Sequence, residues 1–242
     1  MAIDAAFVQG WSKVYELRGR QVSAAGGTSY RWHLPTGIRH VAATPWDVEV
    51  ALLAQLHNRA SLSRDQFLEV CYWKTPRRFE DAASNAPRAV TTATAKAFGL
   101  LTDNPSDPEG AATALMHLRG VGVPTASALL TMAYPDLATV LDIRALRTLH
   151  ANGELRCPNA RWQRLLATEP QAPFPATRSS VAAYRTAARS WWGKTERIWR
   201  RQYAAYVEIC LGVLSHCGGA PLTLRNLDRA LWYAGGATQA PK

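Results

Sequence analysis

Apolar residues recur along this chain at intervals of three and four positions, the spacing that places them on one face of a helix. Strictly alternating apolar and polar runs, which would indicate strands, are scarce. The pattern therefore predicts an all-α protein. Its clearest amphipathic run covers residues 196–214, where one face carries Ile198, Trp199, Tyr203, Tyr206, Val207, Cys210, Leu211 and Leu214.

Capping residues indicate where several helices begin. Thr44-Pro45 opens one helix and Ser63 caps another, which Thr75-Pro76 ends. Asp107 or Ser106 caps a helix that we expect to reach Leu118. The segment 25–40 is a loop or a short hairpin, and the proline-rich segment 152–178 is a loop or linker. Further helices are expected over residues 7–22, 86–101, 123–132, 143–150 and 222–233.

Residues 119–122, Arg-Gly-Val-Gly, form a short turn between two of these helices. Gly120 and Gly122 allow the backbone to turn tightly and to approach a ligand closely. Amides at the start of the following helix can then bind a phosphate oxygen without any charged side chain. A plain corner between two helices, with no ligand, explains the same glycines.

Asp142 follows Val140-Leu141 and precedes a helix, so a role as N-cap is expected. A second role is chemical. Breaking an N-glycosidic bond develops positive charge on the sugar ring, and a carboxylate beneath the ring stabilises that charge or orients an attacking water.

The chain has 242 residues and a formal net charge of +10, which favours a polyanionic partner, although charge also serves solubility. Its four cysteines, Cys71, Cys157, Cys210 and Cys217, form no zinc-binding pattern. We expect Cys71 and Cys210 to be buried. The first residues lack the pattern of a secretory signal, and no apolar run is long enough to span a bilayer. These features together predict a reduced, cytoplasmic protein without membrane association.

The hairpin and the aspartate together resemble the helix-hairpin-helix DNA glycosylases, the superfamily of the endonuclease III, MutY-type and AlkA-type repair enzymes. The resemblance is carried by residues 110–150, where the matching positions are Leu118, Gly120, Val121, Gly122, Thr125, Ala126 and Asp142. It implies a two-lobed helical fold with the active-site cleft between the lobes. One lobe would comprise residues 1–40 and 150–242, and the other residues 41–149 with the hairpin and Asp142.

The resemblance also implies a function. It implies a monomeric enzyme of base excision repair that is located at the nucleoid and binds double-stranded DNA. The enzyme would flip a damaged or mispaired base out of the duplex and hydrolyse its N-glycosidic bond, with Asp142 as the catalytic residue. The amides near Gly120, Val121, Gly122, Val123 and Thr125 would hold a DNA phosphate, with a monovalent cation possible at the hairpin carbonyls.

Two departures from the family refine this expectation. Relatives that also cut the strand carry a catalytic lysine two positions after the second hairpin glycine. Pro124 stands there and has no amine, which implies a monofunctional glycosylase without lyase activity. Only Cys210 and Cys217 lie near the C-terminus, too few for the iron–sulfur cluster of many relatives. No metal or other cofactor is expected.

Other residues are candidates for DNA contact. Lys74, Arg77 and Arg78 mix with the aromatic Tyr72 and Trp73 near a helix end, where they would touch phosphates and stack on a flipped base. A buried aromatic pair beside a solvated cationic face is an equally good interpretation. Additional candidates are Arg144 for DNA contact or for pairing with Asp142, and Trp32 and His33 as a wedge or pocket wall, although such residues more often cap a core. Another set lies opposite the apolar face of its helix, where a solvated face is the default interpretation and nonspecific DNA contact the second: Arg197, Arg200 and Arg201.

Two other classes of function remain open. A noncatalytic DNA-binding protein or damage sensor would keep the same fold, and Pro124 favours it slightly. A helical protein that binds something other than nucleic acid would show no affinity for DNA. The sequence does not identify the base that an active enzyme would remove. The absence of the catalytic lysine favours alkylated or deaminated bases as substrates.

Overall fold

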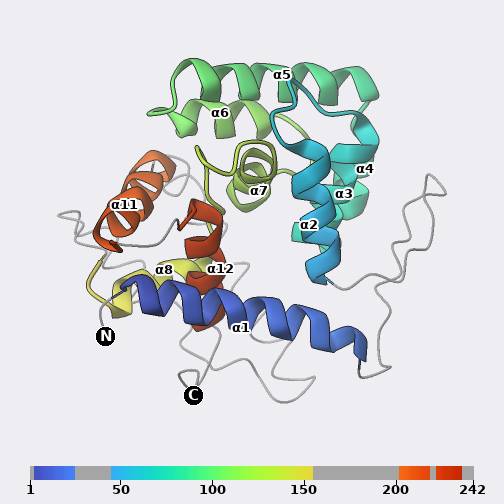
Figure 1. The fold of residues 1–242 in the computed structure, drawn as a ribbon. Coiled ribbons are helices and arrows are strands. Elements are labelled where there is room, and N and C mark those ends of the chain that lie inside the picture. The colour runs from blue at the N-terminus through green and yellow to red at the C-terminus, as the bar shows by residue number, and fades with distance from the viewer. Residues whose placement is uncertain (1–2, 25–44, 155–201, 219–221, 236–242) are drawn as a thin grey trace, which may run out of the picture.

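The computed structural model describes residues 3–24, 45–154, 202–218 and 222–235. Within these ranges the regular structure is helical and contains no strand (Figure 1), which confirms the all-α prediction. The segment 25–40 and most of 152–178 lie outside the described residues. The helices are α1 (Ala5–Ala24), α2 (Pro45–Leu56), α3 (Arg64–Lys74), η1 (Pro76–Arg78), α4 (Phe79–Ala83), α5 (Pro87–Asp103), α6 (Pro108–Leu115), α7 (Val123–Ala133), α8 (Ile143–Ala151), α11 (Tyr203–His216) and α12 (Leu224–Ala234).

Most helix starts agree with the capping signals. Ser63 forms a reciprocal capping box with Gln66 at the start of α3, and the side chain of Asp107 accepts from the Gly110 amide at the start of α6. The end of α6 was predicted wrongly: the helix stops at Leu115, not at Leu118. The Leu118 amide still bonds to the Leu115 carbonyl, but in a tight turn, because the chain is already entering the hairpin.

Helix α7 lies in the middle of the molecule and is buried on nearly every side (Figure 1). It packs against α2, α3, α5 and α6, and α5 covers α6 from outside. A helix that is apolar all round is typical of a core position. The segments flanking α7, the hairpin before it and residues 134–142 after it, are consequently held at its two ends.

Helices from the two ends of the chain pack together on another side of the molecule. Helix α12 lies against α1 and α8, and α11 contacts both α12 and α6 (Figure 1). Cys71 and Cys210 are buried, as expected, and burial raises the pKa of the Cys210 thiol to about 12. In α11 the predicted apolar face was partly wrong: Leu211 is 46% exposed, while Val213 is buried in its place, because the buried face continues from Tyr206 through Cys210 to Val213.

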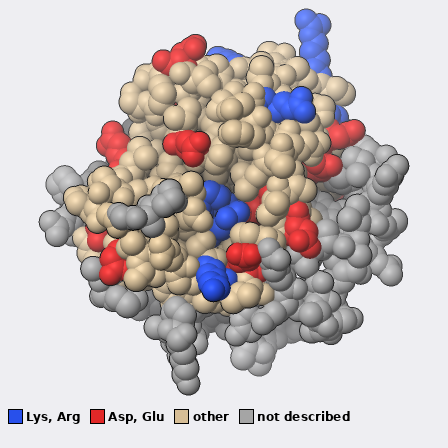
Figure 2. All heavy atoms as spheres, in the orientation of Figure 1, with Lys and Arg blue, Asp and Glu red and all other residues tan. Residues whose placement is uncertain are grey.

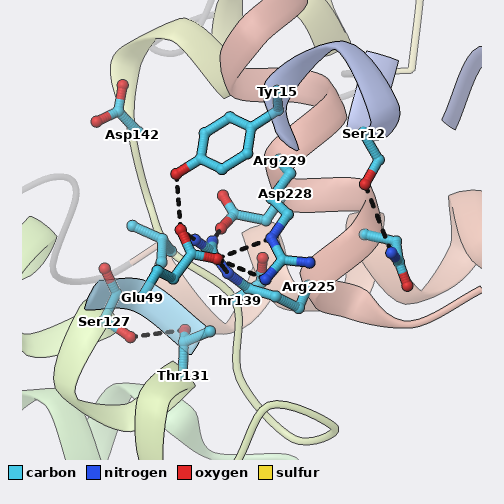
Figure 3. Close-up of polar contacts among 12 residues, drawn as sticks. Ser12, Tyr15, Glu49, Ser127, Thr131, Thr139, Asp142, Arg225, Asp228 and Arg229 are labelled. Carbon is cyan, nitrogen blue, oxygen red and sulfur yellow. Dashed lines mark hydrogen bonds and ion pairs between the residues drawn. The ribbon is translucent and has the colours of Figure 1, made fainter. Parts of the chain in front are cut away.

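A buried group of charges ties α2 to α1 and α12 (Figure 3). Glu49 is fully buried, and Tyr15 donates to its Oε2 at 2.7 Å. The guanidinium groups of Arg225 and Arg229 each lie 2.6 Å from its oxygens, and Arg225 also pairs with Asp228. Desolvation acts to raise the pKa of the Glu49 carboxyl, but the two guanidinium groups outweigh it and hold that pKa below its usual value.

Helices α1, α8, α11 and α12 form one contacting set, and α2–α7 form another, with α1–α2 and α6–α11 contacts between them. The expected division into lobes of residues 1–40 with 150–242 and 41–149 stays a prediction. No helix among the described segments is long and apolar enough to cross a membrane.

Replacing Glu49 with alanine should lower the free energy of unfolding by about 3–5 kcal/mol, because Arg225 and Arg229 would lose the carboxylate that they share and only Arg225 would keep another, Asp228. Urea denaturation followed by circular dichroism measures the change. Glu208→Ala, on the exposed side of α11, is the control and should shift stability by less than about 0.5 kcal/mol. Equal midpoints for the two variants would contradict the structural role of Glu49.

Candidate active site

The hairpin between α6 and α7 is packed tightly against α4. Gly120 is buried and has a φ of +77°, in the left-handed region that favours glycine. A Cβ atom placed there would lie 2.7 Å from the backbone nitrogen of Ala82. Gly120 is therefore required both by the turn and by the close approach of α4, and this requirement holds with or without a ligand.

Asn85 fastens the hairpin from the α4–α5 connection. Its side-chain amide donates to the Arg119 carbonyl at 2.9 Å, and its Oδ1 accepts from the Arg119 amide at 2.9 Å. Arg64 in turn donates to the carbonyls of Ala83 and Asn85, which fixes the connection itself. Asn85 was not predicted from the sequence, because nothing local to residue 85 indicates a partner 34 positions away.

The amides at the start of α7 face few internal acceptors. Those of Thr125 and Ala126 bond to the Gly122 carbonyl. Those of Gly122 and Val123 donate to no acceptor among the described residues. The side chains of Val121 and Val123 are buried and anchor the turn. Two N–H groups are thus left without an internal acceptor at the N-terminus of α7, one of them in the fully buried Val123, and the binding of a phosphate here stays a prediction.

Asp142 is the N-cap of α8, as predicted: its Oδ1 accepts from the Arg144 amide at 3.0 Å. The three residues before it are held by side chains from other helices. Tyr203 donates to the Thr139 carbonyl, Tyr206 donates to the Val140 carbonyl, and the Leu141 amide donates to Ser127. Asp142 therefore sits on a backbone fixed by α7 and α11.

The second carboxylate oxygen of Asp142 pairs with Lys74, the last residue of α3. Nζ and Oδ2 are 2.9 Å apart, and the side chains are 12% and 19% exposed. Burial acts to raise the pKa of the Asp142 carboxyl. The Lys74 ammonium and its hydrogen bond, with the Arg144 amide, outweigh burial and hold that pKa below its usual value. The carboxylate is therefore ionised at neutral pH and partly open to solvent.

The end of α3 connects Asp142 to the hairpin helix. Lys74 contacts Asp142, and the next residue, Thr75, shares a hydrogen bond with Thr125 at 2.8 Å between hydroxyl oxygens. Thr125 belongs to the first turn of α7. Two consecutive residues, Lys74 and Thr75, thus contact the Asp142 carboxylate and the first turn of α7.

The other candidate residues have mixed surroundings. Tyr72 packs edge-on against Phe79, with ring centroids 5.4 Å apart, and Trp73 lies 5.7 Å from the Arg225 guanidinium, so both contact the protein interior. Arg78 is half-exposed and pairs with Asp81. The guanidinium of Arg144 lies over the Trp232 ring at 4.3 Å. The Arg77 side chain, Trp32, His33, Arg197, Arg200 and Arg201 lie outside what the structure describes.

Charge is distributed unevenly over one face of the molecule. On the face drawn in Figure 2, basic atoms lie near the middle among uncharged atoms, with acidic groups on several sides. In Figure 3 the Asp142 carboxylate lies apart from the buried Glu49 group, so the two acids are in different surroundings. No group of three or more metal-ligating side chains occurs in the described part of the chain.

No protein-family model matches this chain, and searches of the curated proteins and of the solved structures return no match. The case for a function therefore rests on the hairpin, on Asp142 and on the contacts that join them.

Gly120→Ala should destabilise the protein by about 2 kcal/mol or more, because alanine strains the left-handed backbone and meets Ala82. Thermal or urea unfolding measures the loss. Gly99→Ala is the matched control: it lies within α5 with open space around it and should be neutral or stabilising by about 1 kcal/mol. A tolerated Gly120→Ala variant would show that the hairpin is not packed as described.

Lys74→Gln should raise the pKa of the Asp142 carboxyl, because desolvation would remain while the neighbouring ammonium would be gone. A carbon-13 NMR titration of the labelled carboxyl measures the shift. Lys96→Gln, an exposed change in α5, removes the same charge and should leave that pKa in place. An unmoved Asp142 titration in the Lys74 variant would mean that the ion pair does not form.

Proposed function

We propose that this protein is a DNA N-glycosylase that hydrolyses the N-glycosidic bond of a damaged or mispaired base in double-stranded DNA. The observation that carries the proposal is the joint placement of two features. Lys74 and Thr75 touch Asp142 and Thr125 respectively, so an ionised carboxylate stands beside the N-terminus of the hairpin helix. A phosphate grip and an acid near the attached sugar are what base excision requires.

The hairpin supplies the grip. The amides of Gly122 and Val123 lack internal acceptors in the described structure and lie at the N-terminus of α7. Val123 is fully buried, so a DNA phosphate oxygen placed there would accept from the Gly122 amide and would gain from the helix dipole. Asn85 and the fit of Gly120 against α4 keep this backbone in place before DNA arrives, so little ordering is needed on binding.

Asp142 supplies the chemistry. Its low pKa keeps the carboxylate negative at neutral pH. As the bond to the base breaks, positive charge develops on the sugar ring, and a fixed anion stabilises that charge and orients the water that attacks C1′. The hydrogen bonds that hold residues 139–141 keep the anion from moving away as the charge develops.

The remaining parts of the proposal follow from the family resemblance. They are a two-lobed glycosylase fold with its cleft between the lobes, flipping of the target base, a monomeric enzyme without metal or iron–sulfur cluster, and a place in base excision repair at the nucleoid. The net charge of +10 supports a nucleic-acid partner.

A noncatalytic DNA-binding protein is the second candidate, and one observation favours it. Both oxygens of Asp142 are already engaged, one by Lys74 and one by the Arg144 amide. A purely structural N-cap with a neutralising lysine would show the same contacts. The two candidates differ in whether the carboxylate acts on DNA.

Asp142→Asn should reduce base release by about 100-fold or more while leaving duplex binding in place, because the amide keeps the cap but loses the charge. The assay is strand breakage after alkali on duplexes that carry uracil, alkylated purines, oxidised bases or mismatches. Asp103→Asn, exposed at the end of α5, is the control with the same charge change and should keep full activity.

Base release that persists unchanged in the Asp142 variant would reject the catalytic role of this residue. Tight duplex binding with no base released from any substrate would favour the noncatalytic protein. Absence of DNA affinity, with no steep dependence on salt, would reject both candidates.

A further inference from the structure

The ion pair of Lys74 and Asp142 is a fixed dipole that solvent partly reaches. Its charged atoms are 2.9 Å apart, and the two side chains are 12% and 19% exposed. An ammonium group has three N–H donors, and within the described residues Lys74 uses one of them, on the Oδ2 atom of Asp142. The other two are therefore left for a ligand beside the carboxylate.

Positive charge exceeds negative charge in the immediate surroundings of Asp142. A neighbouring carboxylate favours the ammonium form of a lysine, so Lys74 offers a cation and N–H donors here, not a nucleophilic lone pair. Arg144 follows Asp142 by two residues, and the charge of its guanidinium also acts on the Asp142 carboxyl. Two cations therefore act on one acid.

We propose that Lys74 donates a hydrogen bond to the departing base, and that the enzyme acts on neutral bases, which leave as anions, in preference to positively charged alkylated bases. This inference rests on the proposed function, because it concerns the base that Asp142 would help to release. It names the class of substrate for that same site.

The reaction separates charge when the base is neutral. The C1′–N bond breaks and its electron pair stays on the base nitrogen, so the sugar becomes positive and the base negative. Water then adds to C1′ and gives one proton to solvent, while the base takes one proton from solvent. Only water is consumed, and Lys74 keeps its proton throughout.

The dipole of the ion pair matches this separation of charge. Sugar and base share the C1′ atom, so a cation paired with the carboxylate beneath the sugar lies near the base as well. Asp142 then stabilises the positive sugar and Lys74 the negative base. A base such as N7-methylguanine starts positive and leaves neutral, so it develops no negative charge, and the two cations near Asp142 repel it on binding.

The test compares single-turnover release of neutral bases (uracil, hypoxanthine, mispaired thymine) and cationic bases (N7-methylguanine, N3-methyladenine), each relative to its spontaneous loss. The wild-type protein should accelerate the release of neutral bases more. Lys74→Gln should lose about 100-fold or more on neutral bases and about threefold or less on cationic ones. Mildly alkaline pH keeps Asp142 ionised in this variant, although the loss of Lys74 raises the pKa of its carboxyl.

Two matched variants and one substrate pair separate charge from structure. Lys74→Arg keeps a cation beside Asp142 and should retain most of the activity that Lys74→Gln loses. Lys96→Gln removes an exposed charge in α5 and should behave like the wild type. 5-Fluorouracil forms a more stable anion than uracil, so Lys74→Gln should slow its release less than that of uracil.

The outcomes distinguish this inference from the proposed function. Greater acceleration for cationic than for neutral bases in the wild type, or equal losses on both sets in Lys74→Gln, would overturn the inference and leave the glycosylase proposal standing. Equal losses on uracil and 5-fluorouracil would do the same. Release of no base from either set would defeat the glycosylase proposal, and the inference with it.

Discussion

The backbone of residues 139–141 is the constraint on which the arrangement of the site depends. Three side chains from α7 and α11 hold it: Ser127 binds the Leu141 amide, Tyr206 the Val140 carbonyl and Tyr203 the Thr139 carbonyl. An extended segment inside a helical protein must satisfy its polar groups in this way, because no neighbouring strand can do so. Asp142 comes next in the chain, so the fixed backbone of residues 139–141 also fixes the position of its carboxylate.

Two acids in the described part of the molecule, Glu49 and Asp142, illustrate how surroundings set the role of a carboxylate. Glu49 is fully buried, and its carboxylate is contacted by two guanidinium groups and a tyrosine hydroxyl. These contacts compensate for the burial of the charge and join α2 to helices from both ends of the chain. Asp142 is 19% exposed and has one ammonium partner. The first arrangement suits structural cohesion, and the second leaves a charged group within reach of a ligand.

Parts of the site could be predicted because their signals are local. Asp142 as an N-cap, Ser63 as a cap and the turn at Gly120 each follow from residues within a few positions. The contacts that join these parts could not be predicted. The pairing of Lys74 with Asp142 spans 68 residues, and the clamp of Asn85 on Arg119 spans 34. Nothing in the period of apolar residues indicates which polar side chains meet across helices.

By itself the sequence determined the helical class, most helix starts, the hairpin and the acid that follows it, because backbone preference and capping act over a few residues. Tertiary structure decided that α6 stops at Leu115, that Leu211 faces solvent, and that the amine of Lys74 and the carboxylate of Asp142 lie side by side. These outcomes depend on which helix faces pack together, and packing is settled only when distant parts of the chain compete for the same space.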